Sequence, residues 1–224
     1  MAFSHTTDFS GTGTGNQVIS VTASQGSAII VCTNNRNAFP TGVSDVAGNT
    51  YTLADQNNNT GSANCSIYYA QATTALSAQN VTVAYGAGGF GEAIVMVFGM
   101  AAGVTLGLRD HGNLHQTSAT PSVSTNGSST LANDLVCGAF ANQTGSITFT
   151  AGTGYTGSTT GQISNSSSEI GAEWNITGSG GSQSAGCTRG SSQNTAMVIV
   201  SLFEQSGSVF LLPQMAVVYM RGNG

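Results

Sequence analysis

Short apolar or β-branched runs, separated by clusters of Gly, Ser, Asn and Thr, recur along almost the whole chain. Residues 81–85 (VTVAY) and 146–150 (SITFT) alternate, which predicts strands with one face in water. Residues 28–31 (AIIV) and 197–200 (MVIV) are continuously apolar, as in strands covered on both faces. No segment combines a 3.6-residue period with a helix cap, and Gly, Thr and Asn are poor helix formers. The pattern predicts an all-β antiparallel β-sandwich or barrel.

The expected strands follow directly from these runs. They span residues 17–22, 27–33, 49–55, 65–70, 80–85, 93–99, 104–108, 134–141, 146–151, 170–176, 197–204 and 209–219.

Three parts are expected along the chain: an N-terminal arm (1–16), a β-sandwich domain (17–207) and a C-terminal strand or assembly arm (208–224). Residues 204–208 (EQSGS) indicate a break before the last part. Its apolar stretch, 209–220 (VFLLPQMAVVYM), is shorter than the roughly 20 residues of a membrane helix and contains Pro213. We therefore expect no membrane span.

Charge is unusually scarce. Only 6% of the 224 residues are charged, against about 25% in average domains, and no lysine is present. The four arginines are dispersed and the net charge is -5, whereas nucleic-acid binding needs clustered Lys and Arg. The absence of lysine also excludes a P-loop and a Schiff base. Solubility must rest on Ser, Thr, Asn and Gln, a composition typical of surfaces and assemblies outside the cell.

The first eight residues (MAFSHTTD) have neither the basic nor the apolar region of a signal peptide. Two expectations follow: the protein is made in a cytoplasm and reaches the outside within a particle, or a signal peptide was removed.

Four cysteines lie far apart, at positions 32, 65, 137 and 187. No CxxC or CxxxC pair is present, which argues against zinc and redox motifs. Cys32 and Cys137 lie in apolar runs, where buried free thiols are expected. Cys65 and Cys187 lie in polar, loop-like stretches. Up to two disulfides are compatible with this spacing, in three pairings that remain open.

Two stretches, 86–91 (GAGGFG) and 152–157 (GTGYTG), match G-x-G-x-x-G. A dinucleotide site needs a helix after this motif, but a strand-like run and a polar loop follow here. We expect hairpin turns at both places, built on glycines with positive φ. No cofactor is predicted.

Ionisable side chains form one compact group, Asp110, His111 and His115. On a helix this spacing would suit a metal, but Gly112 breaks a helix, so a solvated loop is expected. Glu169 and Glu173 would share a strand face near the spacing of a glycosidase pair, but an exposed polar strand is the better expectation. No serine lies in a G-x-S-x-G elbow. No catalytic or metal site is predicted.

Aromatic side chains offer a further possibility, sugar binding. Trp174, Tyr155, Tyr68 and Tyr69 could serve, although aromatic residues on strands usually pack in the core.

Several segments together resemble jelly-roll-like β-sandwich modules of bacterial extracellular proteins and phage virion (decoration and tail) proteins. They lie in order along residues 17–204: 43–53 (VSDVAGNTYTL), 67–70 (IYYA), 81–83 (VTV), 134–136 (DLV), 152–156 (GTGYT), 173–174 (EW) and 197–203 (MVIVSLF). The resemblance implies a jelly-roll-like fold and no shared catalytic residues. Two departures are the segment 97–99 (VFG), where the modules have an acidic residue, and the apolar tail.

We therefore expect a non-enzymatic structural or interaction protein, a phage head decoration or tail subunit located in the virion. It would form homo-oligomers or bind capsid or tail proteins by strand addition. The tail residues expected to bind the partner are Val209, Phe210, Leu211, Leu212, Met215, Val217, Val218 and Tyr219. The alternative is a secreted bacterial adhesin or carbohydrate-binding module that contacts a cell-surface glycan.

Overall fold

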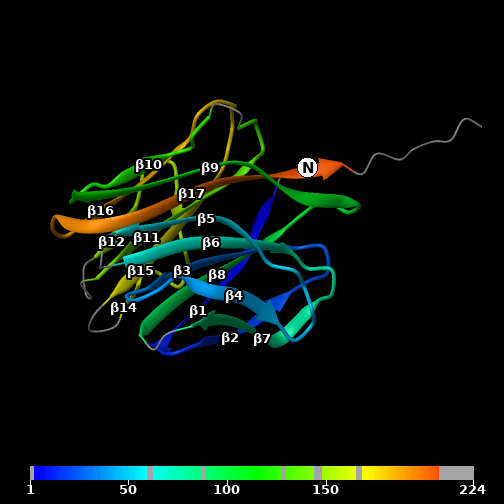
Figure 1. Cartoon of the computed structure of the whole chain (residues 1–224). Helices are drawn as coiled ribbons and strands as arrows, with labels where there is room; N and C mark the ends of the chain where they lie inside the picture. Colours follow the sequence, from blue (N-terminus) through cyan, green and yellow to red (C-terminus); the bar gives the residue numbers. More distant parts are fainter. Residues whose placement is uncertain are drawn as a thin grey trace, which may run out of the picture.

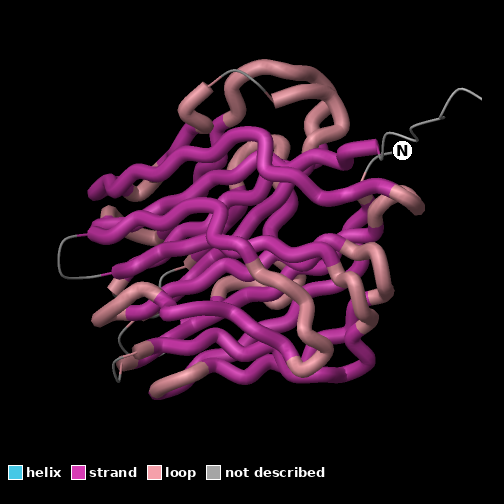
Figure 2. Tube along the Cα trace, turned by 45° about the vertical axis from the view of Figure 1, so that its right-hand side comes forward, coloured by secondary structure: helices cyan, strands magenta, loops and turns pink. Residues whose placement is uncertain are grey.

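The computed structural model describes residues 3–59, 63–86, 89–127, 130–143, 148–164 and 168–206. All regular secondary structure in these ranges is β-strand, so the all-β prediction is confirmed (Figures 1 and 2). The first half of the chain contains β1 (Ser4–Thr14), β2 (Gln17–Ala23), β3 (Ala28–Asn35), β4 (Pro40–Asp45), β5 (Thr52–Asn59), β6 (Ala63–Gln71), β7 (Leu76–Tyr85) and β8 (Phe90–Gly99). The second half contains β9 (Val104–Ser118), β10 (Ser122–Ser124), β11 (Leu135–Asn142), β12 (Phe149–Ala151), β13 (Thr156–Gly157), β14 (Ile163–Ser164), β15 (Glu169–Ile176), β16 (Ser184–Arg189) and β17 (Gln193–Ser206).

Four antiparallel sheets lie in four layers (Figure 2). The two large sheets face each other across a central core that includes Ile30, Met96, Cys137 and Val198. A small sheet covers the far side of each large sheet, over two further cores. The central strands β3, β8, β11 and β17 are therefore covered on both faces, which explains their continuously apolar runs.

The two halves have the same strand order. The first half forms a large sheet β1-β8-β3-β6-β5 and a small sheet β2-β7-β4. The second half forms β9-β17-β11-β15-β13, with β14 also paired to β15, and β10-β16-β12. Replacing β1 to β8 by β9, β10, β11, β12, β13/β14, β15, β16 and β17 converts one arrangement into the other.

Register and bulges repeat as well. Ala28 pairs with Phe98 and Gln71, and Leu135 pairs in the same way with Leu202 and Ile176. The edge strands β1 and β9 each contain one extra residue, a β-bulge. In β1 the bulge lies opposite Phe98 and Val97 of β8, and in β9 it lies opposite the equivalent residues of β17, Leu202 and Ser201. These bulge residues are Thr6 and Arg109. Because bulges are specific, retained features of a fold, their coincidence indicates an internal duplication.

The duplicated halves meet through equivalent surfaces. β1 lies against β14, while β5 lies against β9, and the strand correspondence exchanges these two contacts. In a two-fold dimer, one element of the first subunit meets a second element of its partner, and the same contact occurs with the two subunits exchanged, which is the pattern here. The chain thus resembles such a dimer fused into one polypeptide.

Several boundaries differ from those expected. Residues 4–14, expected within an N-terminal arm, form β1 and pair with β8. β4, β10, β13, β14 and β16 have no counterpart among the predicted strands. The predicted strand 209–219 lies outside the described residues.

Candidate functional site

The group Asp110, His111 and His115 lies on β9 rather than in the predicted solvated loop, because β17 pairs with this strand over its length. Residues four apart along a strand are separated by about 13 Å, too far for His111 and His115 to bind one metal. Among the described residues, no three His, Cys, Asp or Glu side chains are grouped as metal ligands.

Glu169 and Glu173 are buried, so the prediction of an exposed polar strand is wrong. Their strand, β15, faces the central core on one side and the small sheet β10-β16-β12 on the other. The small sheet supplies the cover. The two glutamates lie about 13 Å apart along the strand and bind different partners, which does not match a glycosidase pair.

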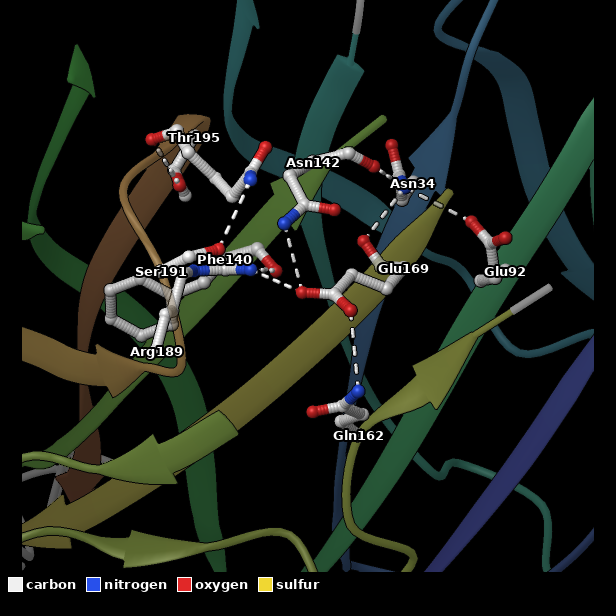
Figure 3. A network of polar contacts seen from close by, with 10 residues as sticks. Asn34, Glu92, Phe140, Asn142, Gln162, Glu169, Arg189, Ser191 and Thr195 are labelled. Atoms are coloured by element: carbon white, nitrogen blue, oxygen red, sulfur yellow. Dashed lines mark hydrogen bonds and ion pairs between the residues drawn. The ribbon is translucent and has the colours of Figure 1, made fainter. Parts of the chain in front are cut away.

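A buried polar cluster joins the halves at the ends of β3 and β11 (Figure 3). Asn34 Nδ2 donates to the Glu92 carboxylate at 3.0 Å and to the backbone oxygens of Asn142 and Glu169 at 3.3 and 2.9 Å. Ser168 Oγ, from the second half, also donates to Glu92. Asn34 and Glu92 therefore anchor the first half to the second.

The Glu169 carboxylate forms the other part of this cluster. It accepts hydrogen bonds from Asn142 Nδ2 at 2.8 Å and Gln162 Nε2 at 3.2 Å, and it forms a buried ion pair with Arg189. A charge buried in this way is tolerable only when it is paired and hydrogen-bonded. The cluster thus has the properties of a structural tether.

Two further polar contacts join the halves at corresponding places. Asp8 on β1 accepts hydrogen bonds from Ser158 Oγ at 3.1 Å and from Thr159 N and Oγ1 at 2.6 and 2.9 Å. Asp55 on β5 bonds His111 Nδ1 at 2.8 Å and Asn113 Nδ2 at 3.0 Å. Asp8 and His111 occupy equivalent positions in the duplication, so each edge of the interface is closed by a carboxylate.

The SD–GN–Y segment is structural. The Asp45 carboxylate accepts hydrogen bonds from Ala47 N (2.9 Å), from Asn49 N and Nδ2 (3.1 and 2.9 Å) and from Tyr51 Oη (3.0 Å). Gly48, at φ +78°, allows this turn. Asn49 in turn bonds the backbone N–H and C=O of Thr74, which connects the β4–β5 and β6–β7 loops.

Both G-x-G-x-x-G stretches connect strands of different sheets, so neither forms the predicted hairpin. Residues 86–91, of which 87–88 are outside the description, join β7 to β8, and residues 152–157 join β12 to β13. Gly154 has φ +84°, as expected of a glycine turn.

All four cysteines are free and buried. Cys65 and Cys187, predicted in polar loop-like stretches, lie on β6 and β16, and burial raises the pKa of every thiol.

The candidate aromatic residues pack largely in the cores. Tyr68 is buried, and Tyr69 packs against the central core. Trp174 packs against the same core, stacks on His5 with ring centroids 5.0 Å apart and contacts the edge of Phe98. Tyr155 packs against the core beneath the small sheet β10-β16-β12 and also lines a surface hollow.

That hollow, the outer-sheet hollow, has a volume of about 230 Å³ and lies on the small sheet β10-β16-β12. Its lining residues are Thr120, Pro121, Ser122, Gly152, Thr153, Tyr155, Ser184, Ala185, Gly186, Cys187 and Thr188. Beneath it, the Glu173 carboxylate accepts hydrogen bonds from Gly152 N at 2.7 Å and Gly186 N at 2.9 Å. Burial raises the pKa of Glu173 to about 7, while these two N–H groups act to lower it.

Sequence reasoning missed the roles of Glu92, Arg189, Gly152 and Gly186. One signal was present: Glu92 directly precedes the apolar run AIVMVF, as expected of a buried charge with a partner. The predicted tail residues Val209, Phe210, Leu211, Leu212, Met215, Val217, Val218 and Tyr219 all lie outside the described residues.

Comparison of the chain with protein-family models, curated proteins and solved structures gives no match. Within the described residues, the structure contains no helix of the length and apolarity needed to cross a membrane.

Proposed function

We propose that this protein is a non-enzymatic structural subunit of a virion, a head decoration or tail component, that assembles with neighbouring chains. The observation that carries the proposal is how the described ionisable side chains are used. Glu92, Glu169 and Arg189 join buried elements, and Asp8 and Asp55 close the edges of the interface between the halves. These groups stabilise a rigid stack of sheets instead of converging on one reactive centre.

We further infer that each half is a jelly roll. In support, each half pairs its first strand with its last in the large sheet, β1 with β8 and β9 with β17. In the small sheets β2 pairs with β7, and the equivalent strands β10 and β16 also pair. The resemblance drawn from residues 17–204 also implied a jelly-roll-like fold, but as one module that spans both halves.

Assembly is assigned to the apolar tail. Residues 209–219 contain eight apolar candidates and no charge, and they directly follow the long strand β17. Such a segment suits strand addition, in which backbone hydrogen bonds supply affinity and alternate side chains enter pockets. This tail would add as a strand to the edge of a sheet in the partner.

Removal of residues 208–224 tests the assembly. The truncated protein should keep the far-UV circular dichroism of the full chain but lose its oligomers in light scattering after size exclusion. The double variant Leu212→Asp/Val218→Asp should behave in the same way, and the matched control Asn223→Asp should still assemble. Unchanged assembly of both altered proteins would refute the role of the tail.

The virion assignment needs a separate experiment. Particles purified from the native source should contain the protein at a fixed ratio to the capsid protein, measured by quantitative mass spectrometry. A protein found only in the free secreted fraction would contradict this assignment.

A further inference from the structure

The two halves differ most in their small sheets, and the outer-sheet hollow lies where they differ. In the first half, β2 and β4 both pair with residues Val81–Val83 of β7. In the second half, β10 pairs with Ser184–Gly186 while β12 pairs only with Cys187–Arg189. One flank of Ser184–Gly186 therefore has no ladder partner among the described residues, and the hollow occupies that flank.

Glycine and glutamate maintain the shape of the hollow. On β16, Ala185 and Cys187 point into the core, so Ser184, Gly186 and Thr188 face outward. Gly186 forms the floor because it has no side chain. Gly152 packs so closely against it that a Cβ on Gly152 would lie 2.3 Å from the backbone oxygen of Gly186. Glu173 binds the N–H groups of both glycines from below. Its equivalent in the first half is Tyr68, as shown by the corresponding pairs Val31–Tyr68 and Gly138–Glu173.

The lining indicates the chemistry of a ligand. No Asp, Glu, Lys, Arg or His side chain lines the hollow, which favours an uncharged ligand. Carbon surface from Pro121 and the Tyr155 ring lies beside hydroxyls of Ser and Thr. The volume equals that of about eight water molecules, enough for a single pyranose ring.

Tyr155 meets the hollow with its ring. Its hydroxyl is buried and has no hydrogen-bond partner in the described structure, so a ligand in the hollow would contact the ring and not the hydroxyl. An aromatic ring at a hollow offers a flat carbon surface on which the C–H face of a sugar ring can pack.

We propose that the outer-sheet hollow binds a neutral sugar ring. The C–H face of the sugar would pack against the carbon surface, while its hydroxyls would bond the Ser and Thr side chains. This binding is independent of assembly through the tail, because the hollow lies wholly within residues 120–188.

The test uses the full-length, ¹⁵N-labelled protein and a panel of free glucose, galactose, mannose and N-acetylglucosamine, titrated to tens of millimolar. At least one sugar should shift the amide resonances of Gly152, Gly186 and Thr188 saturably. Ser184→Trp, which fills the hollow from an exposed position, should abolish the shifts, and Ser20→Trp on the exposed face of β2 should retain them.

Thr188→Val, which replaces one outward-facing hydroxyl of the lining by a methyl group, should weaken binding by about three- to tenfold, the range expected for one hydrogen bond. Tyr155→Phe, which removes only the buried hydroxyl, should leave binding unchanged. Saturable shifts that are unchanged in both Ser184→Trp and Thr188→Val would overturn the proposal. So would the absence of saturable shifts for every sugar of the panel.

Discussion

At the scale of single residues, Glu173 makes the stability of the fold depend on pH. Burial raises its pKa from 4.5 to about 7, so the folded protein binds a proton more tightly at this site than the unfolded chain. Stability from this group is fully present below about pH 4.5 and is lost as the pH rises through 7. The shift corresponds to about 3 kcal/mol at most.

We therefore predict that Glu173→Gln flattens the pH dependence of stability between pH 5 and 8. The free energy of unfolding of the wild type should fall over this interval, measured by urea denaturation at several pH values. Ser20→Ala, an uncharged change on the exposed face of β2, should retain the wild-type slope. Equal slopes for wild type and Glu173→Gln would show that Glu173 is not the titrating group.

At the scale of strands, sequence patterning predicted the elements that are covered on both faces. The apolar runs of β3, β8, β11 and β17, flanked by Gly, Ser and Asn, are typical of strands buried on both faces. β1 (SHTTDFSGTGT) carries no such signal, because an edge strand is held mainly by backbone hydrogen bonds to its neighbour, here β8. Its assignment needs the partner strand, which lies about eighty residues later in the chain.

Residues 109–115 failed as a prediction for the same reason. Gly112 and the cluster of polar side chains resemble a loop, but β17 provides a continuous ladder. The candidate site was hidden in a similar way. Gly152, Glu173 and Gly186 come together only because the small sheet that contains β12 and β16 packs on the large sheet that contains β15. Each of these residues alone carries no signal in the sequence.

The bulge at Arg109 provides a prediction about β9 as a whole. Deleting Arg109 should remove the bulge and make Leu108–Leu202 and Asp110–Ser201 consecutive pairs of a regular ladder, so both parts of β9 keep their partners and faces. Substitution by Ala keeps the bulge and removes only the contacts with Asp134 (2.6 Å) and the Phe203 ring (4.2 Å). We expect a loss of about 1–3 kcal/mol for Arg109→Ala and a loss of similar size for the deletion, because both lose the same side chain.

Thermal unfolding of both proteins measures these losses. A deletion much more harmful than Arg109→Ala would mean that the bulge itself, and not only the Arg109 side chain, stabilises β9.

At the scale of the whole molecule, the duplication escaped sequence analysis because the halves share positions rather than residue types. Asn35 and Asn142 match, but Tyr68 corresponds to Glu173 and Thr6 to Arg109. What persists is the alternation of faces: in both halves the same positions of the central strands point to the core between the large sheets. Two halves that share one core in this way should not unfold separately.

Trp174, the single tryptophan, tests this cooperativity. It belongs to the second half but stacks on His5 and makes a T-shaped contact with Phe98, both of the first half, so its fluorescence reports separation of the halves. Far-UV circular dichroism reports loss of the strands. We predict coincident urea transitions by the two probes, because exposing the shared core would remove cover from Ile30, Met96 and Val198 together. A fluorescence transition at lower urea than the dichroism transition would show instead that the halves part while each stays folded.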